Sequence, residues 1–252
     1  YGRITARIIN ACTRLRVISK HGSGTDTIDI NAAEARGVAV KAAAGANAAA
    51  VAEHTWALIL ACAKSIPQLD ARMHAGHWDK AIHKGLELNG RTLGLIGIGA
   101  IGARVAAVGA AMGMRVMAYD PFVRSAPAGI ALRDLDDVVK HADILSLHCP
   151  LTPGNRNLIG RERLASMPRG AILVNTARGG LVDAAALIEA LKSGHLRAAG
   201  LDAFSEEPPP AELPFRGVPG LIMTPHIGGV TGDAYRNMGT AAAENILAVL
   251  NQ

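Results

Sequence analysis

The segment TLGLIGIGAIGARVAAVGAAMGMRVMAYD, residues 92–120, constrains the fold of this chain more than any other. An apolar run is followed at once by Gly97, Gly99 and Gly102 in the spacing GxGxxG, then by a helical pattern, and a second apolar run closes with Asp120. Glycines between a strand and a helix let the backbone approach a pyrophosphate, and the first free amides of the helix face the anion. The segment therefore predicts a βαβ unit that binds a dinucleotide.

Each glycine has a separate task in such a turn. Gly97 allows the tight turn, Gly99 allows the backbone to approach the phosphates, and Gly102 allows the helix to pack closely on the strand. We expect the amides of Ala100 and Ile101 to bind the phosphates. The alternative, glycines that serve a tight turn alone, accounts for neither the helix nor the acidic residue that follow.

The acidic residue at the end of the second strand bears on the choice of cofactor. A carboxylate in this position accepts hydrogen bonds from the ribose hydroxyls of the adenosine and repels a 2′-phosphate. Asp120 therefore favours NAD over NADP. Arg124 follows four residues later and would soften this preference if it faced the ribose, but after Pro121 we interpret it as a solvated loop charge.

The rest of the chain alternates short apolar runs with helical patterns, which is typical of α/β units around a parallel sheet. One alanine-rich helix is predicted over 46–75, bent or broken at Pro67. An extended loop is predicted over 205–214, because three consecutive prolines forbid a helix there. The predicted strands are LRVIS, VAV, TLGLIG, RVMAYD, DILSLH, AILVNT, RAAGLDAF and LIMTPH.

Composition excludes several other classes of protein. With 252 residues, half of them apolar, the chain can bury a sizeable core, and its net charge of +5 comes from scattered basic residues with only 3% aromatics, which favours small anionic ligands over nucleic acid. Three cysteines without metal spacing fit reduced thiols in the cytoplasm. The apolar stretch 56–63 is too short to cross a membrane, and no signal peptide is visible.

Polar residues close three of the later predicted strands. Arg178 lies in AILVNTARGGLVD, Asp202 and Glu207 in GLDAFSEEP, and His226 in LIMTPHIGG. Taken singly, a strand-end arginine or glutamate is usually solvated and a lone histidine is usually structural. Because parallel strands end at one edge of a sheet, the four together indicate an active site there.

Two other histidine motifs are weaker. His148 and Cys149 invite a metal or nucleophile interpretation, but no second ligand lies at a usable spacing. Glu53 and His54 resemble half of a zinc-protease helix without the second histidine, so packing or capping is the simpler interpretation. We expect no metal site.

The motifs, taken in order, resemble the D-isomer-specific 2-hydroxyacid dehydrogenase family over nearly the whole chain. Besides those above they include GSGTDTIDINAAEARGVAV (22–40), AGANAAAVAEHT (44–55) and HCPLTP (148–153). The resemblance implies an oxidoreductase that transfers a hydride between NAD(H) and a small D-2-hydroxy acid or 2-oxo acid, of the glyoxylate or hydroxypyruvate, D-glycerate, 3-phosphoglycerate or D-lactate type. It also implies a homodimer.

The resemblance assigns catalytic roles to three residues. Arg178 would hold the substrate by its carboxylate and polarise its carbonyl, a task suited to a planar charged fork. His226 would exchange a proton with the substrate oxygen, and Glu207 would pair with the imidazole and stabilise its protonated form. Glu206 is the neighbouring candidate, and the family's Glu-Pro pair selects Glu207.

Further contacts are implied by the same resemblance. The substrate carboxylate would meet the backbone amides of Ser23 and Gly24, although Ser23 also suits an ordinary turn. The nicotinamide carboxamide would lie near Asp202 and the adenosine over Pro150. The remaining cofactor residues implied are Thr176, Ala177, Arg178, His226, Gly228 and Gly229.

The implied fold has two lobes. A Rossmann domain, 47–230, is inserted in a flavodoxin-like substrate-binding domain made of 1–46 and 231–252, and the first strand of that domain is not in this chain, so we expect an N-terminal truncation. The loop usually written NxPG is AAAG here, residues 42–45.

One other function remains open on sequence alone, and a third is disfavoured. An NAD(H)-sensing corepressor with little or no turnover resembles the same family, and the motifs do not separate it from an enzyme. A formate dehydrogenase would have glutamine in place of Glu207. The physiological acid and the preferred direction are not determined by the motifs, although a chain ending at Gln252 is expected of short members rather than of phosphoglycerate dehydrogenases with a C-terminal regulatory module.

Overall fold

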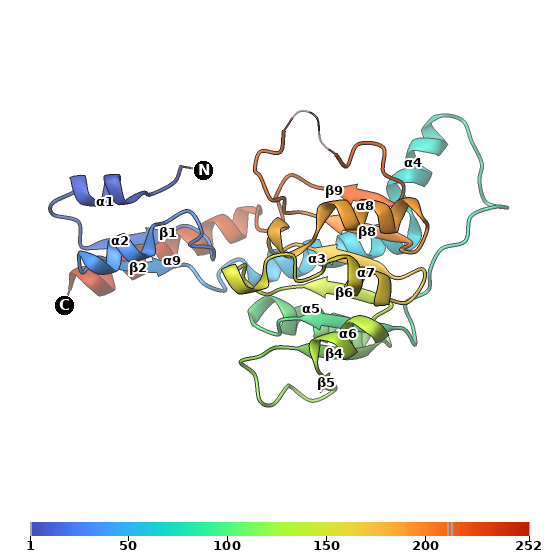
Figure 1. Ribbon diagram of the computed structural model, residues 1–252, viewed down its shortest axis with the longest axis horizontal. Helices are drawn as coiled ribbons and strands as arrows, with labels where there is room; N and C mark the ends of the chain where they lie inside the picture. Colours follow the sequence, from blue (N-terminus) through green and yellow to red (C-terminus); the bar gives the residue numbers. More distant parts are fainter. Residues whose placement is uncertain (1, 211, 213, 252) are drawn as a thin grey trace. The chain divides into compact units, whose positions relative to one another are not determined.

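The computed structural model describes residues 2–210, 212 and 214–251 (Figure 1). Within this part of the chain the residues divide into two compact units. The first unit comprises the residues up to Ala50 and those from Gly229 onward, and the second unit is Val51–Gly228. The boundaries expected from the sequence, 46/47 and 230/231, lie a few residues from these, and helix α3 (Ala48–Lys64) spans the division at Ala50.

The second unit is built on one parallel sheet whose strands lie side by side in Figure 1 in the order β5-β4-β3-β6-β7-β8-β9. The chain order reverses between β3 and β6, which is the switch point at which doubly wound sheets bind nucleotides. This is the predicted α/β Rossmann arrangement. The strands are β3 (Thr92–Ile96), β4 (Arg115–Tyr119), β5 (Ile130–Leu132), β6 (Ile144–Leu147), β7 (Ile172–Asn175), β8 (Ala198–Leu201) and β9 (Leu221–Met223).

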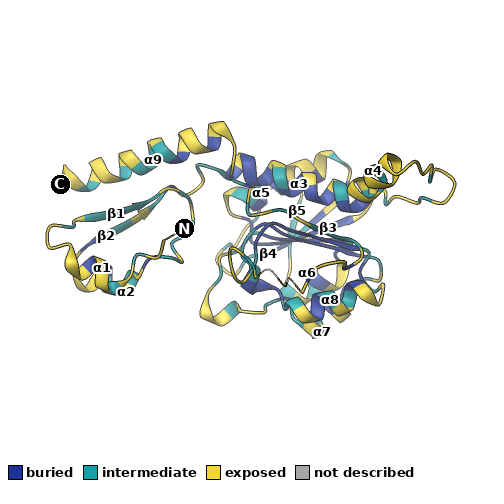
Figure 2. Ribbon diagram, turned by 90° about the horizontal axis from the view of Figure 1, so that it is seen from above, coloured by how far each residue is buried: buried dark blue, intermediate teal, exposed yellow. Residues whose placement is uncertain are grey.

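Helices cover both faces of this sheet (Figure 2). Because both faces are covered, every residue of β3, β6, β7 and β8 is buried, which is why these strands are mostly apolar in the sequence. One face carries α3 and α5 (Ala100–Ala111), and the other carries α6 (Leu135–His141), α7 (Arg161–Ser166) and α8 (Ala184–Lys192).

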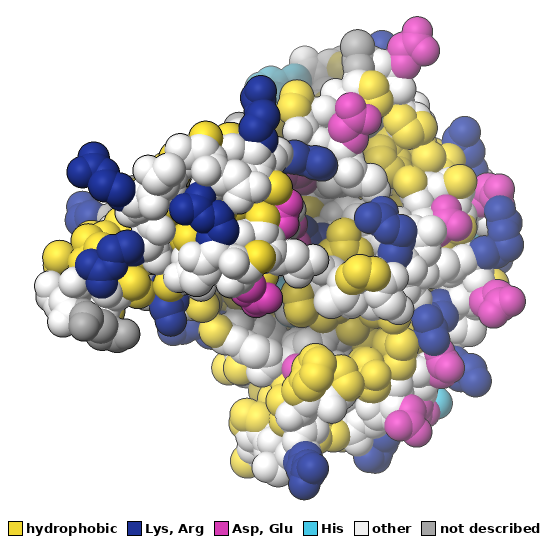
Figure 3. Space-filling view, turned by 60° about the vertical axis from the view of Figure 1, so that its left-hand side comes forward, with side chains coloured by type: hydrophobic (Ala, Val, Ile, Leu, Met, Phe, Trp, Pro, Cys, Tyr) yellow, Lys and Arg dark blue, Asp and Glu magenta, His cyan; other side chains and the backbone are white. Residues whose placement is uncertain are grey.

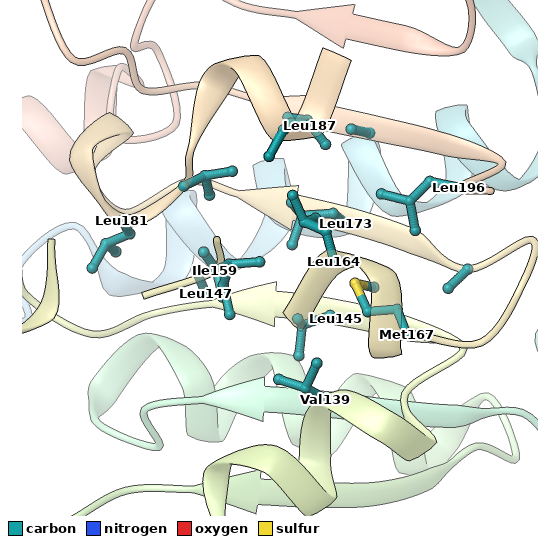
Figure 4. Packing of buried hydrophobic residues seen from close by; sticks show 14 of the residues in the cluster. Val139, Leu145, Leu147, Ile159, Leu164, Met167, Leu173, Leu181, Leu187 and Leu196 are labelled. Carbon is teal, nitrogen blue, oxygen red and sulfur yellow. The ribbon is translucent and has the colours of Figure 1, made fainter. Parts of the chain in front are cut away.

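Two apolar clusters fix the sheet against its helices. Under α6, α7 and α8, side chains such as Val139, Leu164 and Leu187 pack on Leu145 and Leu173 of the sheet (Figure 4). The cluster under α3 and α5 includes the buried Trp56, Ile59 and Val105. Burying each large aliphatic side chain contributes about 1.5–3 kcal/mol, so the strands form a rigid base for the turns at their carboxyl ends.

Two local expectations need correction. The predicted helix over 46–75 is broken, but at Ser65, which has φ 55°, and not at Pro67; α4 (Ile66–His74) starts anew there, with the proline in its first turn, where no amide hydrogen is needed. Strand β5 was not predicted from the sequence, because its three apolar residues, Ile130–Leu132, make too short a run to indicate a strand.

The first unit holds a two-stranded parallel sheet, in which β1 (Val17–Lys20) pairs with β2 (Ala39–Ala42). Helix α9 (Gly232–Leu250) packs on both strands, and Arg16 donates to the carbonyls of Val249 and Leu250 near its end. A small core contains Ile9, Ile18 and Val38. The other helices of this unit are α1 (Ala6–Ala11) and α2 (Ile30–Ala35).

Two short 3-10 helices, η1 (Pro153–Asn155) and η2 (Gly179–Leu181), complete the elements of the described residues. None of the helices in the described ranges combines the length and the apolar character that crossing a membrane requires. The same residues contain no group of three or more His, Cys, Asp or Glu side chains placed to hold a metal ion.

Candidate functional site

The glycine turn after β3 is shaped by close backbone contacts. Gly97 has φ 93°, and a Cβ there would lie 3.0 Å from the backbone of His148 and Cys149 in the turn after β6. A Cβ on Gly102 would fall far inside van der Waals distance of the Gly97 carbonyl oxygen. At Gly99, by contrast, a Cβ would meet nothing within 4 Å. Two glycines therefore serve packing, and Gly99 faces open space.

Helix α5 begins directly after this open position. Gly99 is its N-cap, and no side chain caps the helix. The amides at its first residues, Ala100 and Ile101, are therefore left for an anion by the usual logic of helix N-termini. An uncapped helix start, beside a glycine whose missing Cβ leaves space, fits the pyrophosphate of a dinucleotide.

Asp120 follows β4 and is half-buried beside the glycine turn. Its Oδ2 accepts from the Ile98 amide at 3.1 Å, and its Oδ1 accepts from the Phe122 amide at 3.0 Å. The carboxylate therefore holds the glycine turn, a role that the sequence did not suggest, in addition to the expected role at the ribose. Arg124 is exposed.

The turn after β6 contributes His148, which is half-buried against the glycine turn. Its Nε2 lies 2.9 Å from the hydroxyl of the buried Ser146. Burial lowers the pKa of His148 to about 4, so its ring is neutral at physiological pH. Burial also raises the pKa of the Cys149 thiol, so it stays protonated, which does not suit a nucleophile. Pro150, expected under the adenosine, is exposed.

Asn175 folds the turn after β7 that presents Arg178. This fully buried residue accepts from the Ala177 amide at 3.0 Å and donates to the Arg178 carbonyl at 2.9 Å. The next residue, Thr176, is tied to α3 by a 2.9 Å hydrogen bond between its hydroxyl and that of Thr55. Arg178 itself is half-buried, and its Nη1 donates to the Ala177 carbonyl at 2.8 Å.

The turns after β7 and β8 touch through their backbones. A Cβ on Gly179 would overlap the backbone of Phe204 and Ser205, so only glycine fits directly after the arginine. The Phe204 amide in turn donates to Oε1 of Glu207 at 2.9 Å. The loop that carries the glutamate is therefore fixed next to the turn that carries the arginine.

A histidine and a glutamate meet at the end of this loop. Nδ1 of His226 lies 2.6 Å from Oε2 of Glu207, with side-chain exposures of 42% and 32%. The partner of the imidazole is thus Glu207, as expected, and not its exposed neighbour Glu206. A carboxylate on Nδ1 fixes the tautomer of the ring and leaves Nε2 to face a ligand.

Asp202 at the end of β8 serves the turn after β9. Its side chain is almost fully buried, and it accepts from the amides of Ile227 at 2.9 Å and Gly228 at 2.8 Å. It also accepts from the hydroxyl of Thr224 at 2.6 Å, and His54 of α3 lies 2.9 Å from the same hydroxyl. The carboxylate expected at the nicotinamide therefore also supports the backbone around His226.

The expected substrate residues of the first unit lie in the turn after β1. Ser23 is exposed, Gly24 is half-buried, and the Ser23 hydroxyl donates to Oδ1 of Asn47 at 3.1 Å. Asn47 also contacts Gly229, where an added Cβ would collide with its amide nitrogen. Asn47 was not singled out from the sequence.

The turns of the second unit that carry expected site residues follow β3, β4, β6, β7, β8 and β9, and all of them leave the same edge of one parallel sheet. The sequence did not point to four residues that hold these turns in place, because three of them contact partners far along the chain and Asn175 bonds to the backbone of its own turn. For two of them, Asn175 and Thr224, the available signal was a polar residue directly after an apolar run. The missed residues are His54, Thr55, Asn175 and Thr224.

Comparison with known proteins agrees with this arrangement. Residues 56–228 match the family described as D-isomer specific 2-hydroxyacid dehydrogenase, NAD binding domain. The chain is 45% identical over 252 residues to a D-3-phosphoglycerate dehydrogenase of Methanocaldococcus jannaschii, covering 98% of this chain and 48% of that protein. It is 43% identical over 250 residues to a hydroxypyruvate reductase of Thermotoga maritima, covering 98% and 82%.

Among solved structures, a D-lactate dehydrogenase from Aquifex aeolicus, complexed with NAD and lactic acid, has a TM-score of 0.89 and 31% identity, covering all of this chain and 81% of that one. The chain spans about half the length of the phosphoglycerate dehydrogenases that it matches. The position of the last residue, Gln252, therefore does not distinguish this chain from the phosphoglycerate dehydrogenases. The family match covers most of the second unit, and the chain belongs to the D-isomer specific 2-hydroxyacid dehydrogenase family.

Proposed function

We propose that the protein is an NAD-dependent oxidoreductase that interconverts a small D-2-hydroxy acid and its 2-oxo acid. The observation that carries this proposal is the 2.6 Å contact between His226 and Glu207, at the same sheet edge as the uncapped glycine turn. A histidine held by a carboxylate is a suitable proton donor and acceptor near neutral pH. A dinucleotide turn and a proton-transfer pair on one edge are the parts that a carbonyl reduction needs.

The cofactor would be held by the backbone of the glycine turn and the start of α5. NAD(H) supplies or accepts the hydride when it is bound. Asp120 would bind the ribose hydroxyls, and its negative charge would disfavour a 2′-phosphate. We expect NADH to bind at least about tenfold more tightly than NADPH, which corresponds to about 1.4 kcal/mol. Calorimetric titration with both nucleotides measures this, and equal affinities would mean that a cation such as Arg124 overrides the carboxylate.

Other residues would line the nucleotide along the sheet edge. Thr176 and Ala177 follow β7, Pro150 follows β6, and Asp202 follows β8. Gly228 and Gly229 follow the histidine in the turn after β9, where an added Cβ would lie too close to Asp202 and Asn47. Each of these positions stands at or near the carboxyl end of a strand in the sheet that carries the glycine turn, which supports the assignment.

Arg178 would bind and polarise the substrate, and His226 would exchange a proton with it. The planar guanidinium of Arg178 pairs with the carboxylate of a 2-oxo acid through two parallel hydrogen bonds and draws electron density from the neighbouring carbonyl. His226 donates the proton from Nε2 to the carbonyl oxygen during reduction and accepts it again during oxidation. Glu207 stabilises the imidazolium through Nδ1 and keeps the ring in place.

The substrate is a small acid with an oxygen on its second carbon. Glyoxylate or hydroxypyruvate, D-glycerate, 3-phosphoglycerate and D-lactate all fit an arginine that binds the carboxylate. Ser23 and Gly24 of the first unit, which would serve as the substrate-binding domain, are proposed to donate backbone amides to the same carboxylate. The Lys and Arg side chains on the face in Figure 3 lie mostly singly, with Asp and Glu among them, which suits a small anion better than nucleic acid.

A homodimer is proposed from the segment around α4. Trp78 and Ile82 are both 74% exposed, and Met73 and Ile66 are more than half exposed. Large apolar side chains gathered on one segment mark a protein interface. Light scattering should give a dimer for the natural protein and a monomer for Trp78→Lys.

We also propose a cytoplasmic location, because Cys12, Cys62 and Cys149 are all free thiols.

The proposal is tested by turnover with the natural full-length protein. Oxidation of NADH is followed by absorbance with a panel of glyoxylate, hydroxypyruvate, pyruvate and 3-phosphohydroxypyruvate, and His226→Ala serves as the control. We expect rapid oxidation with at least one acid and almost none in the variant. NADH binding without turnover of any acid would contradict the enzyme and favour a nucleotide-sensing protein.

A further inference from the structure

We propose that His54 is a positioning residue that acts through Thr224 and Asp202 to hold the turn Thr224–Gly228 in the conformation that presents His226. The expected effect of His54 on catalysis rests on the proposed function, whereas its expected effect on the conformation of the turn does not. His54 lies on α3, 170 residues before Thr224, and touches none of the proposed reacting groups.

The backbone of the turn has an unusual conformation at its centre. His226 has φ 54°, in the left-handed region that residues other than glycine seldom occupy, and its amide donates to the Thr224 carbonyl at 2.9 Å. Such a conformation persists where the surrounding structure imposes it. The amide hydrogen bonds of the two following residues, Ile227 and Gly228, supply that constraint, since both end on Asp202.

Asp202 fills this role as a buried carboxylate. Burial by itself raises the pKa of Asp202, but hydrogen bonds from His54, from Thr224 and from the amides of Ile227 and Gly228 outweigh it, so the pKa lies below its ordinary value. The group is therefore charged at neutral pH and accepts hydrogen bonds only. Its orientation decides where the two amides of the turn are held.

His54 fixes that orientation through Thr224. Because Asp202 is an acceptor, the Thr224 hydroxyl must donate its one hydrogen along the 2.6 Å contact to Oδ1. The Thr224 oxygen then accepts from Nε2 of His54 at 2.9 Å, and the same Nε2 lies 3.4 Å from Oδ1 of Asp202. The network thus requires a hydrogen on Nε2 of His54, and the bonds strengthen one another in sequence.

The position of His54 is itself rigid. Its neighbours on α3, Thr55 and Trp56, are buried, and Trp56 donates from its ring nitrogen to the Val105 carbonyl of α5. Gly228 packs against the network so closely that a Cβ there would lie 2.9 Å from Oδ2 of Asp202 and 3.5 Å from the His54 ring. The helix therefore acts as a fixed support from which the turn after β9 is held.

The first test uses hydrogen exchange in the protein without cofactor or substrate. His54→Phe keeps the ring but removes the Nε2 donor, Thr224→Val removes the hydroxyl at the centre of the network, and His54→Gln keeps a donor. We expect the amides of Ile227 and Gly228 to exchange about tenfold faster or more in the first two variants and near the natural rate in His54→Gln. Natural exchange rates in both His54→Phe and Thr224→Val would overturn the proposal.

The matched control is His195→Phe. His195 is also half-buried and hydrogen-bonded, with its Nε2 3.0 Å from the Leu164 carbonyl, but it precedes β8 and so lies at the opposite edge of the sheet. Its replacement should leave exchange at Ile227 and Gly228 unchanged. Faster exchange at these amides in the control as well would assign the effect to general loss of stability and would overturn the proposal.

The second test measures catalysis with the best acid from the panel. In His54→Phe we expect kcat of reduction to fall about tenfold with KM for the acid little changed, because Arg178 is untouched. The pH profile of kcat should shift to lower pH as His226 leaves Glu207, and His54→Gln should restore it. Faster exchange with unaltered kcat and pH profile would overturn the catalytic part, whereas absence of turnover in the natural protein would refute the proposed function and leave the exchange test to decide the role of His54.

Discussion

The turn after β3 and the turn after β9 leave the same edge of one parallel sheet, but they are built in opposite ways. The first turn depends on missing side chains, since a Cβ on Gly97 or Gly102 would collide with backbone. The second depends on side chains that are present, since Asp202, Thr224 and His54 hold its amides. Backbone amides suit an anion that must be approached closely, whereas a proton donor needs a side chain held in one orientation.

Because the two turns are built differently, nucleotide binding and proton transfer should be separable by mutation in this protein. A change that adds a side chain to the first turn should damage nucleotide binding. A change that removes a side chain from the second should damage turnover and leave the nucleotide bound. The following experiments test that separation.

The largest effect is expected from His226→Ala. If the histidine is the proton donor, kcat of reduction should fall about 10²-fold or more, while the dissociation constant of NADH stays within about twofold, because the glycine turn is untouched. Steady-state kinetics and a fluorescence titration of NADH measure the two quantities. Full turnover in the variant would remove His226 from the mechanism. A parallel loss of NADH binding would contradict the separation of nucleotide binding from proton transfer.

The converse change is Gly102→Ala. The added methyl group would collide with the Gly97 carbonyl oxygen, so β3 and α5 must move apart. We expect the free energy of unfolding to fall by about 1–3 kcal/mol and the NADH affinity by about 10- to 100-fold. Urea unfolding and nucleotide titration measure them. The matched control is Gly99→Ala, whose methyl group meets no protein atom: stability should be retained while affinity falls, and the reverse pattern would contradict the roles assigned to the two glycines.

The turn after β7 contains both a glycine that leaves no room for a side chain, Gly179, and a functional side chain, Arg178. Arg178→Lys retains the charge but loses the planar fork, so we expect KM for the 2-oxo acid to rise about tenfold, with kcat and NADH binding less affected. An unchanged KM, measured by steady-state kinetics, would mean that the substrate carboxylate is bound elsewhere. Gly179 should not be altered in this experiment, because the neighbouring backbone leaves no room for a side chain.

The smallest effect concerns the turn after β6, where His148 lies against the glycine turn. Its pKa is lowered to about 4 in the folded protein, so below the ordinary value of 6.5 the unfolded chain binds more protons than the folded one. Stability from this residue is therefore lost as pH falls from 6.5 toward 4. Between pH 7.5 and pH 5 we expect a loss on the order of 1 kcal/mol that is absent in His148→Gln. Equal pH dependence of urea unfolding in both proteins would contradict a buried neutral ring.

Much of the fold could be predicted because its signals lie in consecutive residues. All eight predicted strands are present, and the glycine turn, the helix and Asp120 fall within one segment of the chain. Strands buried on both faces are mostly apolar, so they are visible in the sequence. Strand β5 was missed because it is only three residues long, and the helix break was misplaced because Ser65, unlike Pro67, is not a residue that marks a break.

The parallel α/β fold, the nucleotide turn and the family resemblance could therefore be predicted from short contiguous motifs. The contacts between distant side chains became clear from the folded structure. It linked Thr55 of α3 to Thr176 after β7 and joined His54 to Asp202 and Thr224 across three separate elements. These contacts depend on how a helix and strand ends far apart in the chain pack around one sheet edge, and that packing is set by the burial of the whole core rather than by any local pattern.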